Sequence, residues 1–242
     1  MKTPSLRIDP VSGANRLVIF DCDGTLADGE HLIAEAMTMM FDREGLAAPT
    51  RAAVQRVIGL SLADAMAVLV PEADGQEHER LAQSYKDAFL AMREARGNPV
   101  EPLYPGVIEA LEALSNANFL LAVATGKSMR GLKRVLAAHD IGHHFISLQT
   151  ADHHPSKPHP SMIQTAMVDA GAVPETTLMI GDTSYDMAMA RSAGAFGIGV
   201  TWGYHGADEL TAAGAQHLID DFSALAPLAH RLTETFHDQP AA

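Results

Sequence analysis

Short aliphatic runs alternate with amphipathic segments through most of the chain. The runs predict buried strands, and apolar residues spaced as on one face of a helix predict helices between them. The predicted strands cover residues 17–19, 119–124, 145–148, 177–180 and 196–200, and the predicted helices cover 107–114, 128–138, 161–170 and 184–191. This alternation predicts an α/β fold, a doubly wound parallel sheet with ligands at the carboxyl ends of its strands.

The segment from residue 28 to 101 has a different pattern, with helical spacing and no credible strand. Its predicted helices cover 31–41, 51–58, 62–69 and 78–95, and Thr50 and Ser61 are suited to cap the second and third. We interpret this segment as an all-α domain inserted after the first strand. The expected parts are therefore an N-terminal tail over 1–15, an α/β core over 16–27 and 102–242, and the helical domain over 28–101.

Two carboxylates follow the first predicted strand one residue apart. In an extended chain alternate side chains share a face, so Asp21 and Asp23 can point together while Cys22 points away. Like charges at a strand end repel and are costly to desolvate, so they need a cation. Mg²⁺, which favours one or two carboxylates plus phosphate oxygens, meets that need.

Polar residues follow two further predicted strands at the same edge of the sheet. Thr125 and Gly126 stand at a helix start, where backbone N–H groups and the helix dipole hold anions. Asp182 is a hard oxygen ligand at a strand end, and Asp186 follows on the first helical turn. Lys157 lies in a Ser-Lys-Pro turn that we expect to point its ammonium inward.

This set resembles, in order and residue type, the four motifs of the haloacid dehalogenase-like hydrolases, a superfamily of phosphatases built on an aspartyl nucleophile. The first motif resembles Asp21-Cys22-Asp23-Gly24-Thr25, the second Thr125, the third Lys157, and the fourth the segment from Gly181 to Asp186. The resemblance covers the whole core, and the inserted helices are similar to the helical cap of the phosphoglycolate phosphatase-like branch. It implies a Rossmann-like core with that cap.

The resemblance also implies a role for each site residue. Asp21 would attack phosphorus and form an aspartyl-phosphate, while Asp23 would act first as general acid and then as general base. Asp21, the backbone carbonyl of Asp23, and Asp182 would hold Mg²⁺, with Asp186 as a ligand or a support. The equatorial phosphoryl oxygens would be bound by Thr125, the Gly126 amide and Lys157.

Composition limits the partners. The chain has 242 residues, 47% of them hydrophobic, and a formal net charge of −13, which argues against nucleic acid or an anionic membrane as partner. No apolar run approaches the roughly 18 residues of a membrane helix, and the first fifteen residues contain no secretory signal. A single cysteine fits a reducing compartment. We therefore expect a cytoplasmic monomer or homodimer acting on a small phosphorylated metabolite.

Alternatives remain open at this stage. A sugar-phosphate mutase of the same fold would return the phosphoryl group to a sugar, a dehalogenase would not need Asp23, and a non-enzymatic module would only bind phosphate. A zinc site at His143, His144, His153, His154 and His159 is disfavoured, because ligand spacing on a rigid helix is missing.

The substrate's leaving group is expected to meet the helical domain. That domain holds seven basic residues, one tyrosine and no tryptophan, so a stacking platform for a nucleobase is poorly supplied. The basic residues are Arg43, Arg51, Arg56, Arg80, Lys86, Arg93 and Arg96. An arginine, or backbone donors of the turn Gly59-Leu60-Ser61, would suit a leaving group that bears a carboxylate or hydroxyls. We therefore expect a small phosphorylated organic acid or sugar, with 2-phosphoglycolate as the best single candidate.

Overall fold

The computed structural model describes residues 14–237 and has a six-stranded, fully parallel sheet at its centre. The strands are β1 (Asn15–Phe20), β2 (Leu120–Thr125), β3 (Phe145–Thr150), β4 (Ala172–Gly181), β5 (Phe196–Val200) and β6 (His217–Ile219). Their order is β3-β2-β1-β4-β5-β6, so the strand order reverses between β1 and β4. Ligands of doubly wound sheets bind at such a reversal, beyond the carboxyl ends of the strands. The predicted α/β fold is confirmed.

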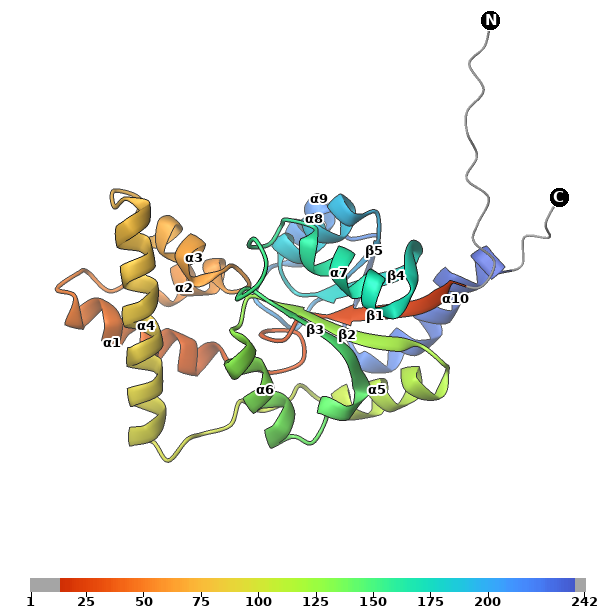
Figure 1. The fold of residues 1–242 in the computed structure, drawn as a ribbon, viewed down its shortest axis with the longest axis horizontal. Helices are drawn as coiled ribbons and strands as arrows, with labels where there is room; N and C mark the ends of the chain where they lie inside the picture. The colour runs from red at the N-terminus through yellow and green to blue at the C-terminus, as the bar shows by residue number, and fades with distance from the viewer. Residues whose placement is uncertain (1–13, 238–242) are drawn as a thin grey trace, which may run out of the picture.

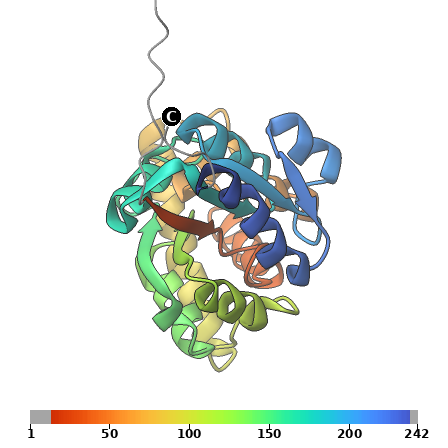
Figure 2. The same ribbon diagram turned by 90° about the vertical axis from the view of Figure 1, so that its right-hand side faces the viewer.

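Helices cover both faces of the sheet (Figure 1). One face packs against α5 (Val107–Asn116), α6 (Met129–Ala138) and α10 (Leu225–His237), and the other against α7 (Ser161–Ala170) and α8 (Ser184–Ala193). The alternation of β1 explains the two layers: Val18 and Phe20 enter the first core, and Leu17 and Ile19 enter the second. On the first face α5 and α10 lie side by side (Figure 2).

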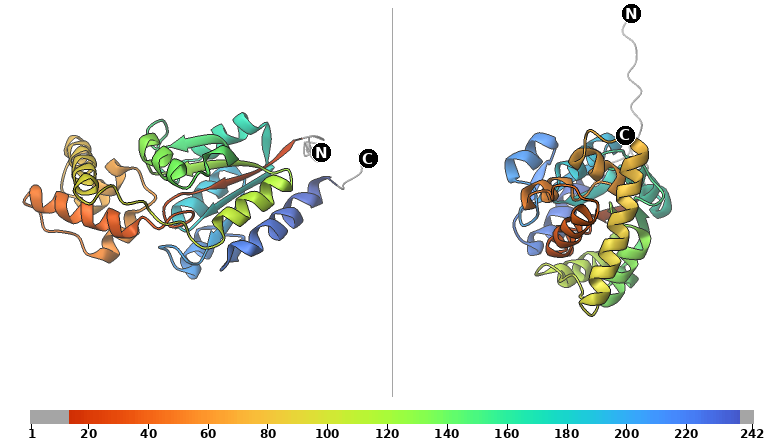
Figure 3. Two further views of the ribbon diagram at one scale, coloured as in Figure 1. Left: turned by 90° about the horizontal axis from the view of Figure 1, so that it is seen from below. Right: turned by 90° about the vertical axis from the view of Figure 1, so that its left-hand side faces the viewer.

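Four helices without a strand follow β1. They are α1 (Glu30–Arg43), α2 (Arg51–Val57), α3 (Leu62–Leu69) and α4 (Gly75–Ala95), and they bury a hydrophobic cluster of their own that includes Met40, Met66 and Leu81. Thr50 and Ser61 accept hydrogen bonds from the first turns of α2 and α3, as predicted. These helices lie at one end of the molecule and the sheet at the other (Figure 3). We call α1–α4 the helical unit.

The chain enters and leaves the helical unit through neighbouring segments. Ala27 and Leu103 form an antiparallel bridge. The backbone N–H of Asp28 donates to the carbonyl of Pro102 at 2.8 Å, and that of Tyr104 donates to Leu26 at 3.0 Å. The two connections therefore run side by side.

Several elements differ from the sequence-based expectation. Helix α4 begins at Gly75, three positions earlier than expected, because Asp74 accepts a hydrogen bond from Glu77 N and caps it. Three elements were not predicted: α9 (Ala207–Ala213), the short edge strand β6, and α10. The expected tail lies outside the described residues apart from its last two positions, and β1 begins at Asn15. Across residues 14–237 no helix is both long and apolar enough to cross a membrane.

Candidate active site

The site residues predicted from the core come together at the carboxyl edge of the sheet. The register pairs Phe20 of β1 with Val123 of β2 and with Ile180 of β4, so all three strands reach this edge together. The backbone N–H of Asp21 continues the ladder by donating to Ile180 O at 2.9 Å. Asp21, Thr125 and Asp182 are consequently brought to one edge, and each is buried.

Lys157 reaches this edge from the loop between β3 and α7. Its Nζ lies 3.0 Å from Asp21 Oδ1 and 2.6 Å from Asp186 Oδ1, and its side chain is fully buried. Burial alone would lower the pKa of Lys157, but the carboxylates of Asp186 and Asp21 outweigh it and raise that pKa. The ammonium therefore stays charged beside Asp21, as the sequence-based hypothesis requires.

Two carboxylates contact this single ammonium, and the carboxylate of Asp182 lies close to both of them. Oxygen atoms of Asp21, Asp182 and Asp186 lie within 4.8 Å of one another. Burial raises the pKa of Asp21 to about 7 against the opposing effect of Lys157, and burial also raises the pKa of Asp182. The group is thus short of positive charge when all three carboxylates are ionised.

The donor set fits a hard divalent cation. Asp21 Oδ2 is buried and has no hydrogen-bond partner within the described residues, while its Oδ1 meets Lys157 and the backbone N–H of Cys22. Three carboxylates against one ammonium leave two negative charges, which a divalent ion balances. Oxygen-only donors of this kind favour Mg²⁺ over zinc.

Asp182 and Asp186 are held by the backbone around them. Asp182 accepts from Thr25 Oγ1 at 2.8 Å and from the Tyr204 N–H at 3.0 Å. Asp186 Oδ2 accepts from the N–H and the hydroxyl of Thr183, which forms a capping box at the start of α8. Gly24 leaves room for this arrangement: its φ is +82°, and a Cβ there would lie 2.2 Å from Asp182 Oδ2.

Asp23 stands apart from the three-carboxylate group. One of its carboxylate oxygens, Oδ1, lies 2.8 Å from Lys127 Nζ. Lys127 also lies 3.7 Å from Glu101, which in turn meets Arg93 and Arg134 at 3.4 Å each. Sequence analysis missed Lys127 and Glu101 as site residues. The position of Lys127, two residues after Thr125 at a helix start, was the available signal, whereas Glu101 had none because it is distant in the sequence from every motif.

The predicted phosphate-binding segment also contacts the helical unit. Thr125 is buried, and its hydroxyl accepts from the Lys127 N–H at 3.3 Å. At Gly126 a Cβ would lie 2.5 Å from Leu60 O and 2.7 Å from Gly59 O, so the turn between α2 and α3 packs directly on this glycine. Nearby, the Ser61 N–H donates to Ser156 Oγ at 2.8 Å. This turn therefore covers the carboxyl edge of the sheet.

A cavity of about 300 Å³ lies between this edge and the helical unit. Asp21, Asp23, Thr125, Gly126 and Lys127 line its core side, and residues of all four helices of the unit line the other. The sequence-based expectation was that an arginine of the helical unit or the turn Gly59-Leu60-Ser61 meets the leaving group. None of these arginines lines the cavity, whereas Gly59 and Leu60 of the turn do. Within residues 28–101 the basic residue that does so is Lys86.

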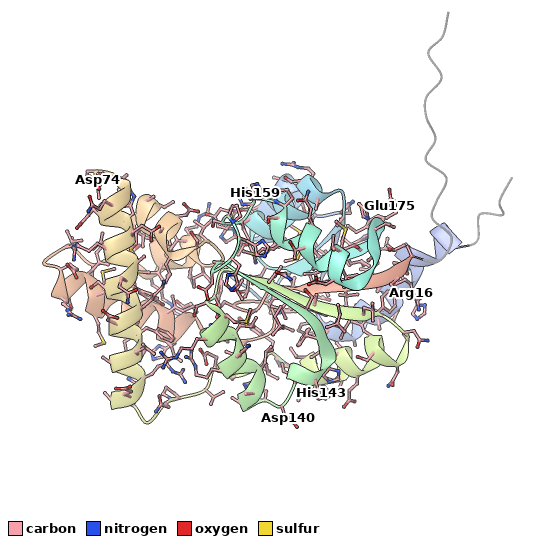
Figure 4. All side chains as sticks on the ribbon, in the orientation of Figure 1. Arg16, Asp74, Asp140, His143, His159 and Glu175 are labelled. Atoms are coloured by element: carbon pink, nitrogen blue, oxygen red, sulfur yellow. The ribbon has the colours of Figure 1, made fainter. Side chains whose placement is uncertain are left out.

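Among the described residues, no histidine belongs to a cluster that could hold a metal ion. The acidic group described above is the only metal-competent cluster that the described part of the chain contains. His143 and His159 lie on opposite sides of the molecule (Figure 4), and His154 instead contacts Ser161 Oγ and Gln149 Oε1 at 2.7 Å each. His143 and His144 lie in a short 3₁₀ helix (Gly142–His144), and His153, His154 and His159 lie in the loop between β3 and α7.

Comparison with known proteins identifies the class. The family model of haloacid dehalogenase-like hydrolases matches residues 18–200. This chain belongs to that family, so the expected resemblance is confirmed. The chain is 39% identical over 220 residues to the curated protein "Probable phosphatase IndB" of Dickeya dadantii strain 3937, a match that covers 89% of this chain and 94% of that one.

Further relatives define the branch within the family. The chain is 28% identical over 218 residues to a phosphoglycolate phosphatase of Vibrio vulnificus strain YJ016, covering 87% of this chain and 94% of the relative. The crystal structure of a "predicted phosphoglycolate phosphatase" from Haemophilus somnus superposes with a TM-score of 0.76 at 27% identity, covering 88% of this chain and 97% of that one. The chain is therefore a hydrolase of the phosphoglycolate phosphatase-like branch.

Proposed function

We propose that this protein is a Mg²⁺-dependent phosphatase that hydrolyses a small phosphate monoester through an aspartyl-phosphate. The observation that carries the proposal is the buried Asp21 carboxylate 3.0 Å from Lys157, with Asp23 lining the same cavity. The names of the relatives, which are phosphatases, support the same reaction class.

In the first displacement the Asp21 carboxylate attacks phosphorus. A phosphorus–oxygen bond forms to Asp21 while the bond to the leaving alcohol breaks, and Asp23 gives its proton to the leaving oxygen. Lys157 makes the approach of a carboxylate to an anion possible by offsetting the charge of Asp21. Thr125 and Gly126 line the cavity, and in this proposal the Thr125 side chain and the Gly126 amide bind phosphoryl oxygens.

In the second displacement water attacks the phosphorus of the aspartyl-phosphate. Asp23, now ionised, takes a proton from that water, the bond between Asp21 and phosphorus breaks, and inorganic phosphate leaves. Lys127, 2.8 Å from Asp23 Oδ1, holds the carboxylate that moves these protons. Asp21 is regenerated as a carboxylate beside Lys157, so the cycle closes without a net change in the protein.

The residues that would hold Mg²⁺ are Asp21, Asp182 and the backbone carbonyl of Asp23. When bound, the ion would offset the negative charge of these carboxylates and of the phosphoryl oxygens. Because Asp186 already binds Lys157 and Thr183, we assign it a supporting role around the ion. The helical unit acts as the cap in this proposal, excluding water from the cavity and contacting the leaving group.

Phosphate release from a panel of phosphate esters with Mg²⁺ tests the proposed function. Intact-mass measurement after rapid quench of Asp23→Asn, which keeps the nucleophile, should show a phosphoryl group on the protein with an activated ester. Asp21→Asn should carry none. Turnover that requires a sugar bisphosphate would favour a mutase instead, and normal phosphate release by folded Asp21→Asn would refute the mechanism.

A further inference from the structure

We propose that the leaving group of the substrate carries a compact apolar body, aliphatic or aryl, which packs against the helical unit. This inference rests on the proposed phosphatase function and names the substrate class of the same site. It departs from the expectation of a small acid, because the structure shows which side chains the leaving group would meet.

The wall of the cavity opposite Asp21 is formed by apolar side chains from four helices. It includes Ile33, Met37, Val57, Leu62, Phe89 and Leu90. Of the polar residues that this unit adds, Gln83, Lys86 and Asp87 are exposed on one helix, α4, and Tyr85 on the same helix is buried. A leaving group bound deep in the cavity would therefore contact carbon on several sides, and burial of apolar surface is the main favourable term available there.

The arginines that would recognise a carboxylate are committed elsewhere. Five of the six arginines in residues 28–101 form ion pairs, and none of the six lines the cavity. These pairs are Arg51–Glu30, Arg56–Glu209, Arg80–Glu44, Arg93–Glu101 and Arg96–Glu35. An acidic group buried against the apolar wall, away from the exposed Lys86, would lose water without gaining a partner, which is unfavourable.

Basic side chains at the other wall do not change this conclusion. Lys127 and Arg134 line the cavity but pair with Asp23 and with Glu101. Arg130 also lines the cavity and is exposed at its rim. These cations lie on the side of the phosphoryl group or at the mouth, so they leave the wall of the helical unit apolar.

The volume limits the size of the apolar body. At about 300 Å³ the cavity is at the lower end of the range for small-molecule sites, roughly 300–1,000 Å³. The phosphoryl group takes part of that space. The remaining room suits a short alkyl chain or a single ring, and it disfavours a nucleotide.

A series of straight-chain alkyl phosphates tests the inference. Ethyl, butyl and hexyl phosphate have leaving alcohols of similar acidity, so differences in kcat/KM report contacts with the chain. Each methylene that the wall buries should raise kcat/KM about fourfold, and butyl phosphate should exceed ethyl phosphate by about 15-fold. The kcat/KM of all three esters should exceed that of 2-phosphoglycolate, and the excess should grow with the length of alkyl chain that the cavity buries.

The outcomes separate this inference from the proposed function. A flat or falling series, or a preference for 2-phosphoglycolate over butyl phosphate, overturns the apolar leaving group while phosphate release upholds the phosphatase. Absence of phosphate release from every ester, 2-phosphoglycolate included, overturns the proposed function itself.

Two positions on α3 provide a matched pair of variants. Leu62 lines the cavity, whereas Val68 on the same helix is 56% exposed and does not. Leu62→Asn should lower the butyl-to-ethyl ratio of kcat/KM about fivefold, and Val68→Asn should keep the wild-type ratio. Leu90→Asn on α4 makes the same test if circular dichroism shows that Leu62→Asn is misfolded. Unchanged ratios in the folded cavity variants would overturn the inference.

Discussion

The two sides of the cavity differ in how they are built and in what they can bind. The side of the sheet presents charged groups, among them the buried Asp21 and Asp23 and the partly buried Lys127, and each is fixed by a strand end or a helix start. The side of the helical unit presents apolar faces of four separate helices. In the proposed mechanism, reaction chemistry and choice of leaving group belong to different parts of the chain, so substitutions on the two sides should have different effects.

The largest effect is expected from removing the nucleophile on the sheet side. Asp21→Asn should lower kcat/KM by at least about 10⁴-fold, because an amide neither attacks phosphorus nor replaces a carboxylate beside Lys157. Phosphate release with Mg²⁺ measures this, and circular dichroism confirms the fold. Asp220→Asn is the matched control, since Asp220 is exposed and lies outside the cavity. An equal loss in both variants would point to a cause other than the nucleophile.

Removal of the metal should have the next largest effect, and it again concerns only the sheet side. An excess of chelator should lower kcat by at least about 100-fold, because two negative charges at the carboxylate group would stay unbalanced. Mg²⁺ should restore the rate, whereas the larger Ca²⁺ should bind and support turnover poorly. Full activity in excess chelator would contradict the magnesium assignment.

A smaller effect is expected where the two sides touch. Gly126→Ala places a Cβ 2.5 Å from Leu60 O, so the turn between α2 and α3 must move off the sheet edge. We expect kcat/KM to fall about tenfold, since displacement of a positioning contact by a fraction of an ångström loosens the substrate. Gly75→Ala is the control, because a Cβ there meets nothing within 4 Å. A wild-type rate for Gly126→Ala would show that this contact does not position the site.

The smallest effect is a shift in thermal stability that depends on pH. Burial raises the pKa of Asp21 to about 7, so the folded, metal-free protein holds this proton more tightly than the unfolded chain does. The protonated Asp21 carboxyl therefore stabilises the folded, metal-free protein at low pH, and this contribution is lost as the pH rises through 7. Mg²⁺ binds the carboxylate form, and its apparent affinity should be at least about tenfold weaker at pH 5 than at pH 8.

Differential scanning fluorimetry with and without Mg²⁺ checks this dependence. The rise in Tm on adding Mg²⁺ should be larger at pH 8 than at pH 5. In Asp21→Asn, which has no titrating group at this position, the difference between the two pH values should shrink. An equal rise at both pH values in the wild-type protein would contradict the link between Asp21 and the metal.

The sheet side was predictable from the sequence because its information is local. A strand followed at once by Asp21 and Asp23 places both carboxylates, and the same holds for Asp182 after β4. Parallel register then brings these strand ends together, so knowledge of the fold class was sufficient. The family resemblance placed Lys157, and the structure brings it to the same edge.

The sequence predicted the helices of the helical unit, but it did not predict which of their side chains line the cavity. Which face of α1 or α4 meets the sheet depends on how the helical unit packs, and no short motif records that. For the same reason the count of basic residues in 28–101 was misleading, because ion pairs such as Arg56–Glu209 take these side chains away from the cavity. Strand β6 was missed because a three-residue edge strand gives little periodic signal. Helix α10 carries Leu225, Leu228, Ala229 and Leu232 at helical spacing, so that its signal was available in the sequence.

The side-by-side entry and exit of the helical unit make it separable in an engineering sense. Because Ala27 and Leu103 are bridged, a foreign insert with closely spaced ends could be joined there without disturbing β1 or α5. We expect a chimera that receives the helices of a relative between these positions to acquire the donor's specificity for the leaving alcohol. It should keep the phosphoryl-transfer activity of the host. A folded chimera that hydrolyses no ester would show that catalysis requires contacts between the core and its own helical unit. The ion pairs that link Asp23 to Arg93 through Lys127 and Glu101 are then the first contacts to restore.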